Sequence, residues 1–453
     1  MYRKNAWLKY DDKQEVLNFA EKYKSYISVS KNERAAIKEA VKLLEANGFV
    51  NVDKVNKIKT GDRIYFLNKN KNVAAYIIGS EPLENGLRIL GAHVDSPRLD
   101  LKENPIYENK GFALGDTHYY GGIKKYQWTT IPLALVGVVC KKDGTVIDIN
   151  IGDNPNDPVV GVTDLLIHLA SDQMEKSLGK AIEGENLDIT LGSMPLSGVE
   201  KEPVKTNVLK ILKEKYDIEE EDFVSAEIEI VPAGPARDYG LDRSMIAAYG
   251  HDDRSCAFTS LMALLDTKEV KKTACCVLVD KEEIGSVGAT GAHSLFFENT
   301  IAKLFKLMGE SHVLWKTRVA LENSEMLSSD VSAGYDPLYA YVNEAKNSAY
   351  LGEGLVFNKY TGSRGKSGSN DAQPEYYAFI RKTMDEANVN WQNAELGKVD
   401  QGGGGTIAYI LANYNMKVLD AGIPVLNMHA PMEIVSKVDV YEAYRGYKAF
   451  LVA

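Results

Sequence analysis

Four apolar runs of the sequence end in side chains that can bind metal ions or move protons. The runs LRILGA, CCVLV, VALENSEMLSS and IPVLNM lead to His93 and Asp95, Glu282 and Glu283, Asp330, and His429. Two further carboxyl groups, Asp252 and Asp253, precede the stretch CAFTSLMALLD, which predicts an amphipathic helix. Imidazole and carboxylate groups are ligands of zinc-type metals, so the sequence predicts a metal site built from these residues.

No single member of this set identifies a metal site. A histidine after a strand is usually a structural residue that has found a hydrogen-bond partner. Glu282 and Glu283 could belong to a solvated loop, and Asp252 could cap the helix that follows it. The argument is repetition, because the same junction of strand end and loop carries a possible ligand each time. Open α/β sheets bind ligands at the carboxyl ends of their strands.

The spacing within two of these motifs fits a division of labour. Residues two apart in an extended chain lie on one face, so Asp95 can accept the ring N–H that His93 does not use for a metal. Glu282 and Glu283 are adjacent and point in different directions. One can therefore bind metal while the other acts on water as a general base.

The elements that would carry these residues alternate between helices and strands. Residues 11–49 place apolar side chains three and four positions apart, which predicts two helices, the second with an N-cap at Ser30. The runs RIYFLN, NVAAYIIG and LRILGAHVD then predict strands, the last two buried on both faces. This alternation predicts an α/β fold.

The pattern changes in the middle of the chain. Between about residues 101 and 237, segments such as TVIDINI and SAEIEIVPAG predict a β-rich unit with one or two helices near residues 164–180. Strand–helix alternation returns after Gly240. We therefore expect a discontinuous α/β domain of residues 1–100 and 238–453, interrupted by an inserted β-rich domain of residues 101–237.

Composition excludes several classes of function. The chain has 453 residues and a formal net charge of −10, which argues against nucleic-acid binding. Its longest apolar run, IPLALVGVVC, is too short to span a bilayer, and its first residues lack the apolar core of a secretory signal. The four cysteines show no CxxC spacing and no disulfide framework. We expect a cytoplasmic protein without nucleic-acid or membrane partners.

Five motifs, in order along nearly the whole chain, resemble those of one enzyme family. HVDSPRLDLK, GHDDRSCAFTSL, DKEEIGSVGATGA, LSSDVSAGYDPLY and GIPVLNMHAPMEI are similar to the metal and catalytic motifs of the aspartyl aminopeptidases, a family of dinuclear zinc exopeptidases. The resemblance implies a three-layer αβα catalytic domain of the zinc-exopeptidase type. It also implies that the inserted β-rich domain serves oligomerisation.

The same resemblance assigns roles to individual residues. The implied zinc ligands are His93 and Asp330 for one ion, Glu283 and His429 for the other, and Asp252 as the bridge between them. The adjacent Asp253 remains the alternative bridge. Glu282 would be the general base, and Asp95 would orient His93.

The implied reaction removes the N-terminal residue of a short peptide. Two zinc ions, with cobalt or manganese as substitutes, would activate a shared water and polarise the scissile carbonyl. Glu282 would take the proton of that water and pass it to the leaving amine. Lys359, in GLVFNKYTGSRGK, is the candidate for binding an acidic N-terminal residue, with Asn358 competing for the matched position.

The resemblance extends to assembly. It implies a homo-oligomer, a dodecamer built from dimers, in which the insertion of one subunit borders the active site of its neighbour. His168, in DLLIHLAS, would then stabilise the reaction intermediate in that neighbouring site. Without the resemblance, His168 is a helix-face histidine with no function.

Two other classes of function and one further segment stay open. Dinuclear metallophosphoesterases usually draw on more histidines than the seven in this chain. A non-catalytic scaffold of the same fold usually loses the base, whereas Glu282 is present. The run Gly402–Gly405, before TIAYILANYN, either holds part of the substrate or serves only close packing.

Overall fold

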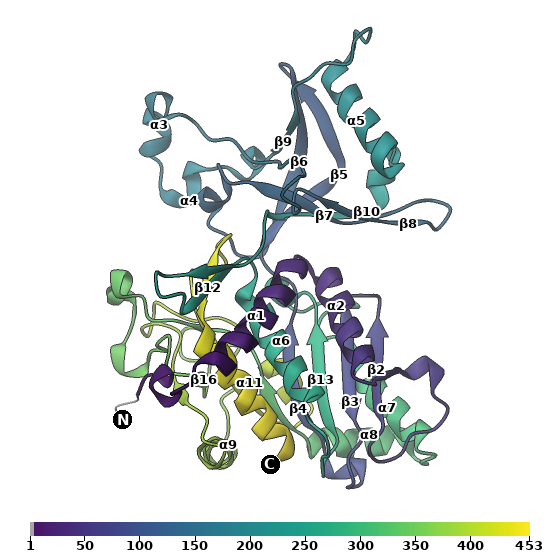
Figure 1. Cartoon of the computed structure of the whole chain (residues 1–453), viewed down its shortest axis with the longest axis vertical. Coiled ribbons are helices and arrows are strands. Elements are labelled where there is room, and N and C mark those ends of the chain that lie inside the picture. Colours follow the sequence, from purple (N-terminus) through teal and green to yellow (C-terminus); the bar gives the residue numbers. More distant parts are fainter. Residues whose placement is uncertain (1–3) are drawn as a thin grey trace. The chain divides into compact units, whose positions relative to one another are not determined.

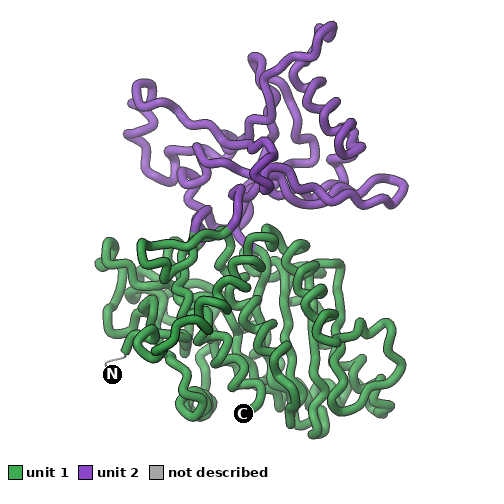
Figure 2. Tube along the Cα trace, viewed as in Figure 1, with its two compact units in different colours: residues 1–95, 236–428, 433–453 green, residues 96–235, 429–432 purple. Residues whose placement is uncertain are grey.

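The computed structural model describes residues 4–453 and divides the chain into two compact units (Figure 2). Unit 1 comprises Met1–Asp95, Ala236–Met428 and Glu433–Ala453, and unit 2 comprises Ser96–Pro235 and His429–Met432. The chain therefore leaves unit 1 after β4 (Arg88–His93) and returns to it after β10 (Ala226–Pro232). No helix within residues 4–453 is long and apolar enough to cross a membrane.

A nine-stranded mixed sheet forms the middle layer of unit 1 (Figure 1). Its strands in spatial order are β1 (Val50–Asn51), β2 (Arg63–Asn68), β3 (Asn72–Ile77), β13 (Ala274–Val279), β4, β14 (Glu325–Ser328), β18 (Lys417–Gly422), β16 (Leu355–Asn358) and β17 (Trp391–Asn393). Strands β13, β4, β14 and β18 are parallel neighbours, so their carboxyl ends meet at one edge. Strands β3, β4, β13 and β14 are buried throughout, as expected where helices cover both faces.

Helices cover the two faces of this sheet. One face packs on α1 (Gln14–Val29), α2 (Glu33–Ala46), α6 (His251–Leu265), α9 (Pro374–Glu386) and α11 (Lys437–Val452). The other packs on α7 (Phe296–Leu307), α8 (Val313–Glu322) and α10 (Ala408–Ala412). The predicted αβα fold class is confirmed. Only Met262 of α6 escapes full burial, so this helix is a core helix and not the amphipathic one predicted from CAFTSLMALLD.

A smaller sheet completes unit 1. Its strands in spatial order are β11 (Arg237–Tyr239), β12 (Met245–Ala248), β20 (Glu433–Ser436), β19 (Pro424–Leu426) and β15 (Ser332–Ala333). The run IPVLNM, which leads to His429, therefore lies in this second sheet and not in the central one.

Unit 2 is built on a six-stranded antiparallel sheet. Its spatial order is β8 (Val146–Ile151), β7 (Leu133–Cys140), β10, β5 (Arg98–Asn109), β6 (Phe112–Tyr120) and β9 (Ile189–Gly192). Helix α5 (Pro203–Tyr216) packs on β5, β6 and β9. The helices expected near residues 164–180 are two single turns, α3 (Ser171–Met174) and α4 (Leu178–Ala181).

The start of α2 differs from its prediction. Ser30 ends α1, where its backbone N–H donates to the carbonyl oxygen of Tyr26. The N-cap of α2 is Asn32, whose side-chain oxygen accepts the N–H of Ala35 at 2.9 Å. Asparagine caps a helix as well as serine does, and its extended backbone places the side chain over the first turn.

Candidate metal centre

His93 stands at the end of β4 with carboxylates on both sides of its ring. Its Nε2 lies 3.1 Å from Oδ1 of Asp252 and 3.9 Å from Oδ1 of Asp330. Its Nδ1 lies 3.2 Å from Oδ1 of Asp95. Burial lowers the pKa of His93, but the hydrogen bonds to Asp252 and Asp95 outweigh it and hold the pKa well above its usual value. Nε2 therefore faces two carboxylates that could share a metal ion with it.

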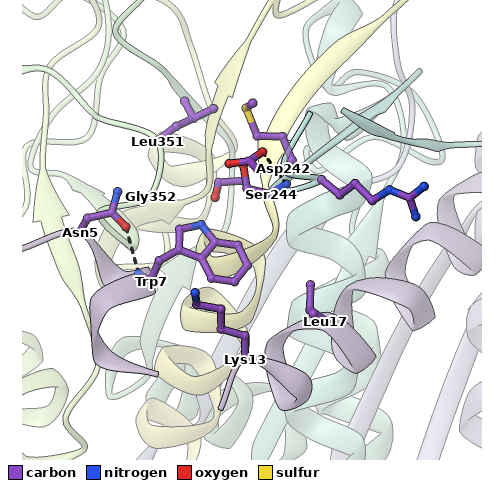
Figure 3. A pocket seen from close by; sticks show the side chains of 11 residues that line it. Asn5, Trp7, Lys13, Leu17, Asp242, Ser244, Leu351 and Gly352 are labelled. Atoms are coloured by element: carbon purple, nitrogen blue, oxygen red, sulfur yellow. Dashed lines mark hydrogen bonds between the residues drawn. The ribbon is translucent and has the colours of Figure 1, made fainter. Parts of the chain in front are cut away.

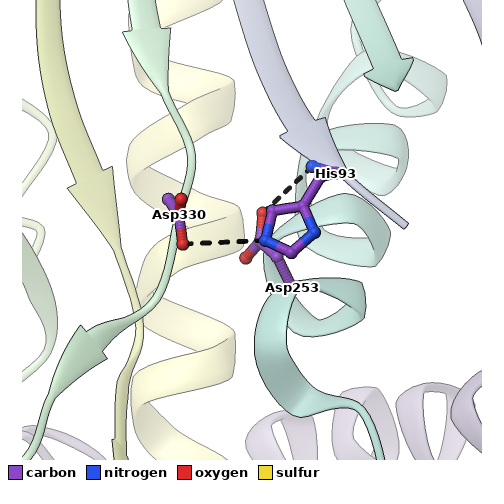
Figure 4. Close-up of side chains that lie close together, drawn as sticks. All are labelled: His93, Asp253 and Asp330. Atoms are coloured by element: carbon purple, nitrogen blue, oxygen red, sulfur yellow. Dashed lines mark hydrogen bonds and ion pairs between the residues drawn. The ribbon is translucent and has the colours of Figure 1, made fainter. Parts of the chain in front are cut away.

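Asp253 lies beside the same ring. Its Oδ2 accepts the backbone N–H of His93 at 3.3 Å, and its Oδ1 is buried without a hydrogen-bond partner. Ligand atoms of His93, Asp253 and Asp330 lie within 4.8 Å of one another (Figure 4). Burial, and then nearby carboxylates, raises the pKa values of Asp253 and Asp330 well above their usual range. A divalent cation is the charge that such a buried acidic set lacks, so these residues fit a metal ion.

Asp95 connects β4 to the loop that carries the two glutamates. The backbone N–H groups of Glu282 and Glu283 donate to its Oδ1 and Oδ2, each at 3.1 Å. Because the same fully buried carboxylate faces Nδ1 of His93, one side chain fixes the imidazole and both glutamates. Ligand atoms of His93, Glu282 and Glu283 also lie within 4.8 Å of one another.

Glu433 accepts a hydrogen bond from the backbone of Asp252, and the sequence did not predict it as a site residue. It lies in β20, is 1% exposed, and its Oε2 accepts the backbone N–H of Asp252 at 3.0 Å. A signal was present, because Glu433 is the last but one residue of the motif GIPVLNMHAPMEI and begins a strand, EIVS, that is otherwise suited to burial. A carboxylate at such a position needs a donor, and here it is the backbone of a predicted ligand.

His429 follows Met428, the last residue of its segment of unit 1, and is itself counted with unit 2. Its Nδ1 lies 2.9 Å from the carbonyl oxygen of Gly122 in the same unit. A carbonyl oxygen can only accept, so Nδ1 carries the hydrogen, and in the neutral imidazole Nε2 then keeps its lone pair. That tautomer is the one a metal ligand needs.

His168 and Lys359 belong to none of the groups of possible metal ligands among the described residues. His168 lies in the exposed 3-10 turn Ile167–Leu169 of unit 2. Lys359 follows β16, and its ammonium group is paired with Asp371, which Lys366 also contacts at 2.9 Å. A hollow of about 220 Å³ adjoins this region of unit 1 and is lined by residues 360–366, 395–400 and Gly402.

A different hollow in unit 1, of about 490 Å³, has lining residues that include Trp7, Lys13, Asp242 and Ser244 (Figure 3). Among the described residues that line it, none is a predicted ligand, base or substrate residue. The chemistry must therefore be sought at the cluster around His93, where titratable groups converge.

Known proteins resemble the chain over its whole length. A family model described as aminopeptidase I zinc metalloprotease (M18) matches residues 26–451. A Clostridium acetobutylicum protein described as "Probable M18 family aminopeptidase 1" is 60% identical over 455 residues, which cover 99% of this chain and 98% of that protein. A Thermotoga maritima protein with the same description is 46% identical over 451 residues, which cover 100% and 99%.

Solved structures show the same similarity. The crystal structure of an M18-family aminopeptidase from Thermotoga maritima has a TM-score of 0.97 at 46% identity and covers 100% of this chain and 99% of its own. Aminopeptidase I from Clostridium acetobutylicum has a TM-score of 0.93 at 57% identity, with both chains fully covered. The mApe1 dodecamer of S. cerevisiae has a TM-score of 0.76 at 19% identity, covers 96% of each chain, and shows the fold alone.

Proposed function

The chain belongs to the M18 family of zinc aminopeptidases, hydrolases that remove N-terminal residues, and we propose how its own residues divide this work. The observation that carries the proposal is the position of Asp95. It holds the ring of His93 and the backbone of Glu282 and Glu283 at once. The proposed ligands His93 and Glu283 and the proposed base Glu282 are thereby fixed relative to one another.

The metal ligands of the proposal number five and bind two zinc ions. By the family resemblance they are His93 and Asp330 for one ion, Glu283 and His429 for the other, and Asp252 as the bridge. Asp252 is favoured as the bridge because its Oδ1 faces Nε2 of His93, whereas Oδ2 of Asp253 already accepts a backbone N–H. Zinc bound at such residues polarises the scissile carbonyl and lowers the pKa of water.

Glu282 is the proposed general base. It takes the proton of the attacking water and returns it to the leaving amine. Its backbone N–H donates to the carboxylate of Asp95. This hydrogen bond holds the loop in place and restricts the positions that the Glu282 side chain can reach. Nδ1–H of His429 donates to Gly122, which fixes the ring that presents Nε2.

The substrate's N-terminal residue is proposed to occupy the 220 Å³ hollow near Lys359. The side-chain amide of Asn358 already donates to the carbonyl oxygen of Ala394 at 2.8 Å. Lys359 is therefore the candidate for binding an acidic N-terminal residue. Lys359 is already paired with Asp371, so a substrate carboxylate would have to replace that partner. Faster cleavage of leucyl than of aspartyl or glutamyl substrates would rule out the acidic preference.

Assembly completes the proposal. His168 is proposed to act in the active site of a neighbouring subunit within a homo-oligomer, a dodecamer by family resemblance. Leu165, Leu166, Ile167 and Leu169 around it are all more than half exposed, which favours burial against another chain. Unit 2 would thus be the oligomerisation domain. The four cysteines are free, in keeping with a cytoplasmic location.

Glu282→Gln tests the central assignment. It removes a base and leaves the five proposed ligands intact, so turnover should fall at least about a hundredfold while two metal ions remain bound. Mass spectrometry of the metals and a panel of aminoacyl substrates supply the two readouts. Asp252→Ala is the contrasting variant and should lose metal at both positions.

A chromogenic phosphate ester tests the phosphoesterase alternative, and wild-type turnover of any aminoacyl substrate excludes a scaffold.

A further inference from the structure

Asp420 is a buried carboxyl group that the proposed chemistry does not use. It lies in β18, is 2% exposed, and stands in register between Ser328 of β14 and Asn358 of β16. Burying a carboxyl group in the middle of a sheet is unfavourable unless it is hydrogen-bonded. Its position therefore calls for a role.

The contact that Asp420 makes leads to the glycine run 402–405. Its Oδ1 accepts the hydroxyl of Thr406 at 2.7 Å, and Thr406 follows the run directly. The Thr406 hydroxyl oxygen in turn accepts the N–H of Ala408, at the start of α10, at 3.3 Å. Successive glycines restrict their own backbone very little, so an anchor at the end of the run decides its conformation.

The glycine run packs on the turn that forms one wall of the 220 Å³ hollow. The N–H of Gly362 donates to the carbonyl oxygen of Gly404 at 2.7 Å. A Cβ atom at Gly403 would lie 2.3 Å from the carbonyl oxygen of Gly362, so only glycine allows this approach. Gly402 and residues 360–366 both line the hollow.

Strand β18 also contacts a proposed metal ligand. A Cβ atom at Gly422, two residues beyond Asp420, would lie 1.6 Å from the carbonyl oxygen of Asp330. One strand thus supports the backbone of Asp330 and, through Asp420 and Thr406, the wall of the hollow.

We propose that Asp420 is a positioning residue for substrate binding. Through Thr406 it fixes the glycine run 402–405, and with it the shape of the hollow that receives the substrate's N-terminal residue. The inference rests on the proposed function, which places that residue in the hollow. Asp420 acts through Thr406 and takes no part in the bond-breaking step.

The test compares variants of Thr406 that lose or keep the hydroxyl group that donates to Asp420. Thr406→Val removes it at constant volume, and Thr406→Ser keeps it. In the assembled, zinc-loaded enzyme, the Val variant should raise KM about tenfold for a series of short peptides, the effect of losing one hydrogen bond to a carboxyl group. Its kcat should stay within about twofold, and the Ser variant should match the wild type. Thr317→Val in α8 is the matched control, because that hydroxyl bonds only to Val313 of its own helix.

A second measurement is independent of activity. Hydrogen–deuterium exchange of residues 401–407 should be about tenfold faster in Thr406→Val, with exchange in β18 unchanged. Equal exchange overturns the anchoring role, and a fall in kcat with unchanged KM overturns the substrate-binding role. If the wild-type enzyme cleaves none of the peptides, the proposed function fails and takes the substrate-binding role with it. The exchange rates then still decide whether the Thr406 hydroxyl, which donates to Asp420, anchors the run.

Discussion

Asp420 makes the stability of the protein depend on pH. Burial raises its pKa to about 7 and outweighs the hydroxyls of Thr406 and then Ser328, which act to lower it. In the unfolded chain the same group titrates near 3.8. Between these values the folded chain binds more protons than the unfolded one, so this residue's contribution to the free energy of unfolding falls as pH rises.

Asp420→Asn should remove this dependence. The free energy of unfolding of the variant minus that of the wild type should rise by up to about 1.4 kcal/mol per pH unit between pH 5 and 7, and then level off. Urea unfolding of the zinc-loaded proteins measures it. Asp371→Asn is the control, because ion pairs with Lys359 and Lys366 lower the pKa of Asp371 and keep its titration below this window. A difference that does not change with pH would contradict the expectation.

Sequence spacing predicts contacts between residues that are close along the chain. The pairing of His93 with Asp95 follows from two positions in an extended chain, and the structure has it. Glu433 contacts Asp252 from 181 residues away, and Asp420 contacts Thr406 only because β18 returns beside α10. Such contacts depend on which strands are neighbours, and residue types alone do not contain that information.

At the scale of elements, β18 packs so closely on the segment that follows β14 that a side chain at Gly422 would have no room. Gly422→Ala would place a Cβ atom against the carbonyl oxygen of Asp330. We expect the variant to displace that backbone, to lose metal at the Asp330 position and to be destabilised by about 1–3 kcal/mol. Metal analysis and thermal unfolding measure both effects.

The control for this variant is Gly179→Ala in α4, where a new Cβ meets nothing within 4 Å. It should bind metal as the wild type does. Full metal content and an unchanged melting temperature in Gly422→Ala would show that β14 and β18 can separate without harm.

The sequence predicts a helix or strand correctly where its residue pattern is characteristic of one kind of element. Unbroken apolar runs identify β4 and β13, because strands covered on both faces carry few polar side chains. The same kind of run identifies β19 as a strand but does not say which sheet it joins, and it joins the smaller one. The sequence CAFTSLMALLD shows polar positions that tertiary packing nevertheless buries in α6.

For the whole molecule, the proposal of a shared active site makes a prediction about hybrids. His168→Phe and Glu282→Gln should each be inactive alone, because each removes one group from every site. Mixed oligomers, formed by dissociating and reassembling the two variants together, should regain activity where Glu282 of one chain meets His168 of another. Each such hydrogen-bond donor contributes roughly 10²–10³ in kcat in other enzymes.

Native mass spectrometry of the mixture shows whether hybrids have formed. Each variant dissociated and reassembled alone is the control. Hybrids that form and remain inactive would place His168 in its own subunit's site or outside the chemistry altogether.

The strand order of the central sheet has a consequence for synthesis on the ribosome. The two neighbours of β4 are β13, which begins at Ala274, and β14, which begins at Glu325, so residues Ser96–Pro235 of unit 2 are made before either of them. At 5–20 residues per second, β4 waits roughly 10–40 s for its first partner. The six-stranded sheet of unit 2 has all its strands by Pro232 and can form during that wait. The nascent chain thus carries an unpaired apolar strand while residues 94–273 are made, and that strand is the one that ends in His93.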